Sequence, residues 1–146
     1  MIDVSDREET RRRALAEGYL VAGPEAVEAV RANRLTKADP LPTARAAALL
    51  AVKNTPTTVP HCHPVRVTAA TVDFEFSTNA VKVTCEVCAC DRTGPQMEAL
   101  CGVTAALLAL YDLVKGLCPT ARLDRVALVE KEGGRSGCWR RGEGGE

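Results

Sequence analysis

The stretch over residues 65–89 restricts the fold most, because it has the pattern of two strands joined by a turn. In its second half, apolar and polar residues alternate as in a strand with one buried face. The apolar positions are Val81, Val83, Cys85, Val87 and Ala89. Its first half alternates in two phases, which a bulge near Ala70 or Thr71 would join. The sequence therefore predicts an antiparallel hairpin of strands 65–76 and 81–89, turning at residues 77–79.

A long apolar helix is expected after the hairpin, over residues 97–117, with Gly116 and Pro119 ending it. The remaining patterns predict a strand over 13–21, helices over 24–33 and 43–53, and a strand over 123–129. This order of elements indicates an α+β fold, a ferredoxin-like βαββαβ sandwich. We expect an antiparallel sheet with helices packed on one face.

The length of 146 residues predicts one compact domain over residues 1–137, followed by a flexible C-terminal tail over 138–146. Apolar residues make up 46% of the chain but aromatic residues only 3%, so the core must consist of Val, Leu and Ala. The seven cysteines lack paired spacing, which favours reduced thiols over a disulfide framework.

Charge and composition argue against two classes of partner. A formal net charge of +0 and few aromatic side chains are unlike a nucleic-acid binder, which carries a basic excess and stacking surfaces. No uninterrupted apolar run reaches the roughly 18 residues that span a bilayer, and the first residues contain no apolar signal region. The sequence therefore predicts a cytoplasmic protein that binds neither nucleic acid nor membrane.

The expected long helix contains three charges in an apolar context. Asp112 and Lys115 are three residues apart and share a face, either as a surface ion pair or as an acid–base pair beside a substrate. Glu98 lies on nearly the same face, but about 21 Å away along the axis. One small substrate cannot easily touch both ends of a single helix. If both ends serve a site, the spacing indicates an oligomer with shared sites; otherwise Glu98 is a first-turn helix charge.

The two histidines of the chain, His61 and His63, flank Cys62 and point the same way if this segment is extended. They fit a general acid or base, part of a metal site, or ordinary loop histidines. A metal site needs further ligands at recognisable spacing, and the cysteines do not supply them. We therefore expect no metal.

Further cations occur in polar segments. Residues 6–13 form a mixed-charge run, which is either a solvated face or a place where one arginine reaches a phosphate. Lys37 is in a loop, and Lys131 and Arg135 flank glycines in a turn. Glycines let backbone N–H groups approach an anion, and cations add charge. The other interpretation of the glycine-rich segment is a flexible tail.

In order along the chain, several motifs together resemble the MoaC family, the cyclic pyranopterin monophosphate synthases of molybdenum cofactor biosynthesis. The motifs are Met1-Ile2-Asp3-Val4-Ser5, Thr36-Lys37-Ala38-Asp39, Thr43-Ala44-Arg45, Cys62-His63-Pro64, Met97-Glu98-Ala99-Leu100, Tyr111-Asp112-Leu113-Val114-Lys115 and Lys131-Glu132-Gly133-Gly134-Arg135-Ser136-Gly137. The resemblance covers nearly the whole chain.

The resemblance implies a lyase that converts a cyclised dihydroguanosine triphosphate, itself made from GTP, into cyclic pyranopterin monophosphate with release of pyrophosphate. It also implies a homo-oligomer with shared active sites, a hexamer built from dimers, and chemistry that needs no metal or other cofactor. The alternative is a non-catalytic ferredoxin-like regulatory domain that binds a nucleotide or another small anion.

The resemblance also assigns roles to residues. Asp112 matches the catalytic aspartate, and Lys115, His63 and Lys37 match groups that assist it. The substrate-binding segments are His61-Cys62-His63 and Met97-Glu98, with Lys131 as a phosphate-binding cation. Three positions depart from the family pattern: His61 stands where an apolar residue is usual, Gln96 where an acid is frequent, and Arg135 where a lysine is usual.

Overall fold

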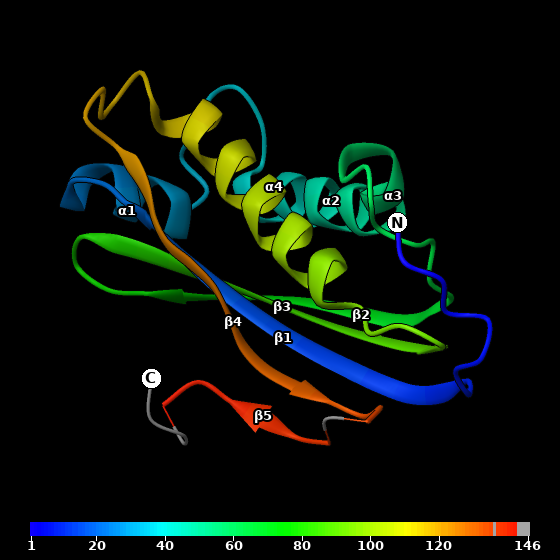
Figure 1. Ribbon diagram of the computed structural model, residues 1–146. Coiled ribbons are helices and arrows are strands. Elements are labelled where there is room, and N and C mark those ends of the chain that lie inside the picture. Colours follow the sequence, from blue (N-terminus) through cyan, green and yellow to red (C-terminus); the bar gives the residue numbers. More distant parts are fainter. Residues whose placement is uncertain (136, 143–146) are drawn as a thin grey trace.

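The computed structural model describes residues 1–135 and 137–142, and its centre is a five-stranded antiparallel sheet (Figure 1). The strands are β1 Thr10–Val21, β2 Val67–Phe76, β3 Ala80–Asp91, β4 Arg122–Glu132 and β5 Trp139–Arg140. They lie in the order β2-β3-β1-β4-β5, with each neighbouring pair antiparallel. The first four strands therefore have the ferredoxin-like arrangement, and the predicted fold class is confirmed.

The helices lie over one face of this sheet (Figure 1). They are α1 Pro24–Arg31, α2 Pro40–Lys53, α3 Thr55–Thr58 and α4 Gln96–Val114. Helices α1 and α2 begin at a proline, which lacks the N–H group that would have no intrahelical partner at this position. The alanine spacing predicted that this helix begins at residue 43. It begins at Pro40 instead, because proline is well suited to the first helical position.

The core lies between the sheet and the helices and consists of small and branched aliphatic residues. The alternation predicted for β3 is confirmed, because Val81, Val83, Cys85, Val87 and Ala89 are all buried. Among the helices, α4 contributes the most buried residues to the core. They include Val103, Leu107 and Leu110, which are 0% exposed. Because this helix crosses the core diagonally (Figure 1), its two ends reach opposite sides of the domain.

Among the described residues, α4 is also the single helix long and apolar enough to cross a membrane by length and composition. Half of its apolar window is buried inside the protein. Its inward residues pack on β1, β3 and β4, with α2 beside it. The apolar character of α4 is therefore accounted for by its place as the central helix of the core.

Two further details differ from the sequence predictions. The bulge in β2 lies between Val67 and Ala69 rather than near Ala70 or Thr71, because the residues in phase with the core begin at Ala70. Helix α4 ends at Val114, and the turn after it is closed by the N–H of Leu117 donating to the carbonyl of Val114.

The C-terminal segment also differs from the flexible tail predicted over 138–146. Trp139–Arg140 forms β5, which pairs with Glu130 and Lys131 of β4. The pairing gives part of the β4 edge a partner for its backbone groups. Residues 143–146 lie outside the described part of the chain, so the prediction of a tail there stays a prediction.

Gly102 marks the closest approach of α4 to its neighbours. A Cβ atom at this position would lie 2.7 Å from Cys85 Sγ and 3.1 Å from Val52 Cγ2. Alanine is the better helix former, but both neighbours are buried and cannot move away freely. We expect Gly102→Ala to lower the free energy of unfolding by about 1–3 kcal/mol, the usual effect of overpacking a core.

Urea denaturation of this variant would measure the change. Gly116→Ala is the control, because a Cβ there meets nothing within 4 Å. An unchanged or higher stability for Gly102→Ala would mean that α4 is not held tightly against β3.

Candidate functional site

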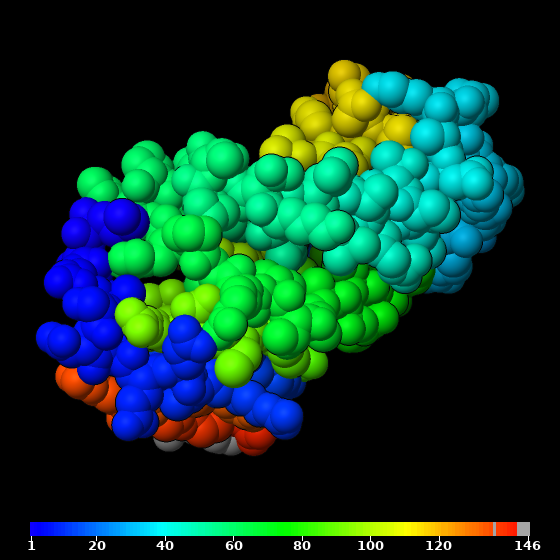
Figure 2. All heavy atoms as spheres, turned by 90° about the vertical axis from the view of Figure 1, so that its right-hand side faces the viewer, coloured from blue at the N-terminus to red at the C-terminus, as the bar shows by residue number. Residues whose placement is uncertain are grey.

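A cavity of about 930 Å³ opens at the N-terminal end of α4. Four separate segments form its wall, namely the N-terminal residues with the start of β1, the loop after α3, the first turn of α4 with the loop before it, and the end of β4 with the turn after it. Figure 2 shows the N-terminal segment, in blue, lying beside the loop after α3, in green. The wall therefore brings together parts of the chain that are far apart in sequence.

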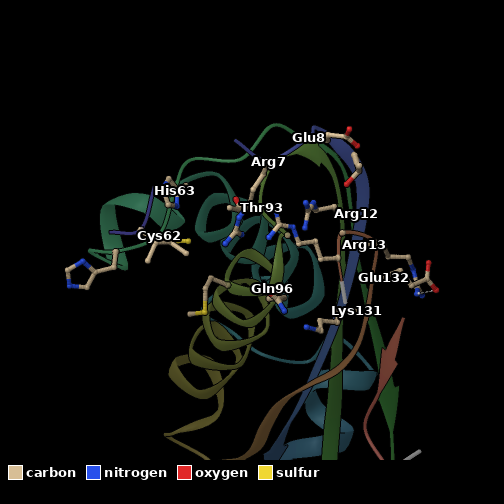
Figure 3. A pocket seen from close by; sticks show the side chains of 18 of the residues that line it. Arg7, Glu8, Arg12, Arg13, Cys62, His63, Thr93, Gln96, Lys131 and Glu132 are labelled. Carbon is tan, nitrogen blue, oxygen red and sulfur yellow. Dashed lines mark hydrogen bonds and ion pairs between the residues drawn. The ribbon is translucent and has the colours of Figure 1, made fainter. Parts of the chain in front are cut away.

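Basic side chains dominate the cavity wall. Its cations include Arg7, Arg12, Lys131 and Arg135. In Figure 3, Arg12 of β1, Lys131 of β4 and Gln96 of α4 lie around the same space. The acidic members of the wall are Asp6, Glu8 and Glu132. Cations from several elements around one hollow suit a ligand with several negative charges.

Arg12 is held in place by two features of the fold. Its Nε donates a hydrogen bond to the carbonyl oxygen of Asp91, at 3.0 Å. Gly134 has a φ of +72°, and a Cβ at this position would collide with the Arg12 guanidinium. Glycine is therefore needed at residue 134 both for its backbone conformation and for the space that Arg12 occupies.

Three acidic residues engage the neighbouring arginine, Arg13, which also lines the cavity. Arg13 pairs with Glu86 at 2.6 Å, with Glu130 at 2.9 Å and with Glu132 at 3.2 Å. Glu132 is the carboxylate nearest in sequence to Lys131, and its pairing with Arg13 offsets its negative charge. The pairing leaves more of the positive charge of the cavity for a ligand.

The structure brings together most of the substrate-binding residues that the sequence predicts. His61, Cys62, His63, Met97 and Lys131 all line the cavity. Glu98 does not. It is 1% exposed and lies behind the wall, with its Oε1 3.9 Å from the Cys62 sulfur.

The predicted catalytic residues form a second cluster at the other end of α4. Lys115 Nζ lies 2.8 Å from Asp112 Oδ1, and Lys37 Nζ contacts Asp112 Oδ2. Lys37 comes from the loop between α1 and α2, so the cluster joins residues from two segments. All three side chains are accessible to solvent. His63, expected to act with them, lies at the cavity instead.

The two lysines decide the charge of Asp112. Hydrogen bonds from Lys115 and then from Lys37 lower the pKa of Asp112 to about 2. The C-terminal end of a helix dipole acts in the opposite direction, and by itself it predicts a raised pKa. Two ammonium groups in direct contact outweigh the partial charge of the dipole. Asp112 is therefore an ionised carboxylate near neutral pH, and it cannot supply a proton there.

Within one chain the two clusters do not meet. Glu98 beside the cavity and Asp112 in the lysine cluster are about 21 Å apart along α4 at the helical rise. Arg7 and Arg12 are cavity residues that the sequence showed only as part of a charged run, and that run also fitted a solvated face. Nothing in the sequence pattern pointed to the contact between Lys37 and Asp112, because 75 positions separate them.

Comparison with known proteins shows the family of the chain. The model of the MoaC family matches residues 1–134. The chain belongs to the MoaC family. It is similar to a Mycobacterium tuberculosis protein named cyclic pyranopterin monophosphate synthase 2, with 39% identity over 141 residues, which cover 97% of this chain and 84% of that protein. It is also 39% identical over 139 residues to the Clostridium perfringens cyclic pyranopterin monophosphate synthase, covering 94% of this chain and 88% of that one.

A third group of side chains offers ligand atoms for a metal ion. Atoms of Glu130, Glu132 and Cys138 lie within 4.8 Å of one another. The two carboxylates already pair with arginines, Glu132 with Arg13 and Glu130 with Arg13 and Arg140. The sequence pattern did not single out this group, and the expected absence of a metal from the chemistry stays a prediction.

Proposed function

We propose that this MoaC family member is a lyase that converts cyclised dihydroguanosine triphosphate into cyclic pyranopterin monophosphate and releases pyrophosphate. The observation that carries the proposal is the cavity lined by Arg7, Arg12, Lys131 and Arg135, in a chain whose relatives are named for that product. A triphosphate carries several negative charges, and a wall of fixed cations matches it. The proposed setting is the cytoplasm.

The phosphate chemistry gives these cations a function. Closing a cyclic phosphate requires a substrate hydroxyl oxygen to form a bond to the α-phosphorus while the bond to the pyrophosphate oxygen breaks. The hydroxyl proton passes to a base, and negative charge builds up on the leaving pyrophosphate. Arg12 and Lys131 are placed to stabilise this charge as it develops. Met97 and the His61-Cys62-His63 segment would lie against the rest of the substrate.

The cluster of Asp112, Lys37 and Lys115 is proposed to act on the ring system. Its ionised carboxylate holds two ammonium groups in defined positions. Lysines held in this way can donate protons to a developing anion or stabilise it. Asp112 then acts as the hydrogen-bond acceptor that orients both lysines.

A complete site needs both clusters, and the length of α4 keeps them apart in one chain. We therefore propose that the protein is a homo-oligomer in which the cavity of one copy meets the lysine cluster of another, as in a hexamer built from dimers. Closed symmetric assemblies bring different patches of identical chains together in this way.

The decisive experiment for the function is incubation of the purified protein with cyclised dihydroguanosine triphosphate. The expected products are pyrophosphate and cyclic pyranopterin monophosphate, detected by chromatography and mass spectrometry. Binding of the triphosphate without release of pyrophosphate would support the alternative, a regulatory domain that binds a small anion.

We predict different kinetic effects for two lysines. Lys131→Ala removes a cation from the cavity and should raise KM about tenfold or more, since hydrogen bonds to charged groups contribute about 1.5–3 kcal/mol. Lys37→Ala removes a partner of Asp112 and should lower kcat by about 10²-fold, the usual scale of a lost proton-transfer partner.

Steady-state kinetics and calorimetric binding of the triphosphate separate the two effects. Lys53→Ala, which changes an exposed lysine at the end of α2, serves as the control. Wild-type KM for Lys131→Ala together with wild-type kcat for Lys37→Ala would mean that both lysines are ordinary surface residues.

A further inference from the structure

Two thiols lie on the face of the sheet that is turned away from the helices. Side chains alternate along β3, so Val87 and Ala89 face the core, while Cys88 and Cys90 face away from it. The helices lie over the core side (Figure 1). Both thiols are free and partly accessible to solvent. Of the seven cysteines of the chain, these are the two that share one face of one strand.

A hollow in the sheet surface accompanies this pair. Cys88 and Cys90 line a cavity of about 470 Å³. In the pairing of β1 with β3, Arg13 stands opposite Cys88, and Arg11 stands opposite the second thiol. The bulge in β2 interrupts the regular pairing at Cys88 and brings Thr68 into the cavity wall. The two small side chains therefore lie between longer ones, which is why a hollow forms here.

The spacing of the two thiols excludes a disulfide between them. Residues two apart on a strand have their Cβ atoms about 7 Å apart, whereas a disulfide needs about 3.8 Å. A metal ion can bridge the gap, because two opposite metal–sulfur bonds of about 2.3 Å each require the sulfurs to be about 4.6 Å apart. Rotation about the two Cα–Cβ bonds can bring the sulfurs to this separation. The pair thus suits a metal ion held by two thiolates.

The number of ligands selects the metal. A structural Zn²⁺ ion takes four ligands, and the cavity offers two sulfurs. In the described part of the chain, the one group of three Cys, His or acidic ligand atoms within 4.8 Å of one another lies elsewhere, at Glu130, Glu132 and Cys138. Thiolates favour Cu(I), an ion that is content with two opposite ligands. Cu(I) is therefore the ion that matches the pair.

The charges around the thiols agree with a monovalent ion. Two thiolates carry two negative charges, so a bound Cu(I) ion leaves one negative charge on the complex. Arg13 is already paired with three carboxylates. Arg11 forms no ion pair among residues 1–135 and 137–142, and it stands opposite Cys90. Arg11 can therefore offset the remaining negative charge.

We propose that Cys88 and Cys90 bind one Cu(I) ion between their two sulfur atoms on the open face of the sheet. Two S–H bonds are replaced by two S–Cu bonds, both protons pass to solvent, and copper stays monovalent throughout. Neither thiol lines the larger cavity at the start of α4. The site is therefore separate from the proposed lyase chemistry and does not rest on it.

Anaerobic titration of the reduced protein with Cu(I), in competition with a coloured Cu(I) chelator, tests the site. The wild-type protein should retain one ion per chain. Cys88→Ser and Cys90→Ser should each weaken binding by about 10²-fold or more, because even the loss of a group outside the ligand shell costs about 10–100-fold. The matched control is Cys138→Ser, which removes an exposed thiol and should bind as the wild type does. A loss in Cys138→Ser as large as in Cys88→Ser would overturn the assignment.

X-ray absorption at the copper edge counts the ligands. Two sulfur neighbours are expected, and three or more would contradict a site made by this pair alone. Zn²⁺ in place of Cu(I) should be lost to the same competition, and its retention with equal affinity would also count against the proposal. Arg11→Ala should weaken Cu(I) binding by about tenfold or more, and Arg11→Lys should restore most of it, because the role of this residue is its charge.

Thermal unfolding provides a check that does not depend on the chelator. Cu(I) should raise the midpoint of the wild-type protein and leave that of the Cys88→Ser, Cys90→Ser double variant unchanged, since a ligand stabilises the state that binds it. The metal-free midpoints show that the variants are folded. If the wild-type protein retains no more Cu(I) than the double variant, the site does not exist, whether or not pyrophosphate is released. If no pyrophosphate is released but one ion is retained, the proposed function fails and the copper site stands.

Discussion

Asp112→Asn is expected to lower the turnover of cyclised dihydroguanosine triphosphate by about 10²-fold or more, the usual scale for a lost proton-transfer group. Asparagine keeps the shape of the side chain but removes the negative charge between Lys37 and Lys115. The two ammonium groups would then repel each other and leave their positions. The cluster is exposed, so the thermal midpoint should hardly change. Single-turnover kinetics and calorimetry would measure both quantities.

The control is Asp124→Asn on β4, whose carboxylate lies 3.9 Å from Arg122 and contacts neither cluster. It should turn over substrate at the wild-type rate. The pH profile adds a check, because a pKa of about 2 keeps Asp112 ionised down to strongly acidic solution. Its stabilising contribution is complete above its ordinary pKa of 3.8 and is lost only as the pH falls toward 2. Near-normal turnover by folded Asp112→Asn would refute the role of this residue.

Mixing two impaired variants is expected to restore activity, measured at a substrate concentration well below KM. Asp112→Asn disables the lysine cluster and Lys131→Ala weakens the cavity. If each site combines the cavity of one copy with the lysine cluster of another, a mixed pair contains one site with both parts intact. Random exchange of dimer partners should then give about a quarter of wild-type activity, because half of the pairs are mixed and half of their sites are intact.

The experiment requires that subunits exchange, which brief exposure to mild denaturant followed by refolding would ensure. As the control, Asp112→Asn mixed with Lys115→Ala should regain nothing, because both changes fall in the same cluster. Activity of the first mixture no greater than the sum of its separate components would show that each chain carries a whole site.

Local patterns explain why much of the fold could be predicted. The β2–β3 hairpin and α4 each repeat one period over many residues, and a long repeat is a strong signal. Helix α3, with four residues, and β5, with two, are too short to show a period. The predicted position of the β2 bulge was a few residues too far along the chain. Alanine is small enough for either face of the sheet, so the sequence does not show which face Ala69 is on, and its pairing with Cys88 decides this.

The site was harder to predict than the fold, because it depends on contacts between distant segments. The motifs identified Lys37, Asp112 and Lys131, but spacing could not show that Lys37 joins Asp112 while Lys131 faces the cavity. The charge of Asp112 likewise depends on a contact between distant segments, because one of the two lysines that lower its pKa comes from another part of the chain.

The central helix also sets a fixed distance and angle between two parts of the molecule. Its N-terminal turn supplies Gln96 and Met97 to the cavity, and Asp112 lies near its C-terminal end. Each residue of a helix advances it by about 1.5 Å and turns it by about 100°. Deleting a single residue within α4 would therefore rotate Asp112 away from Lys37, and it would also turn buried residues such as Leu107 and Leu110 out of their places in the core. The number of residues between Met97 and Asp112 is therefore itself a functional constraint. Insertions and deletions are easier to accommodate in the loops.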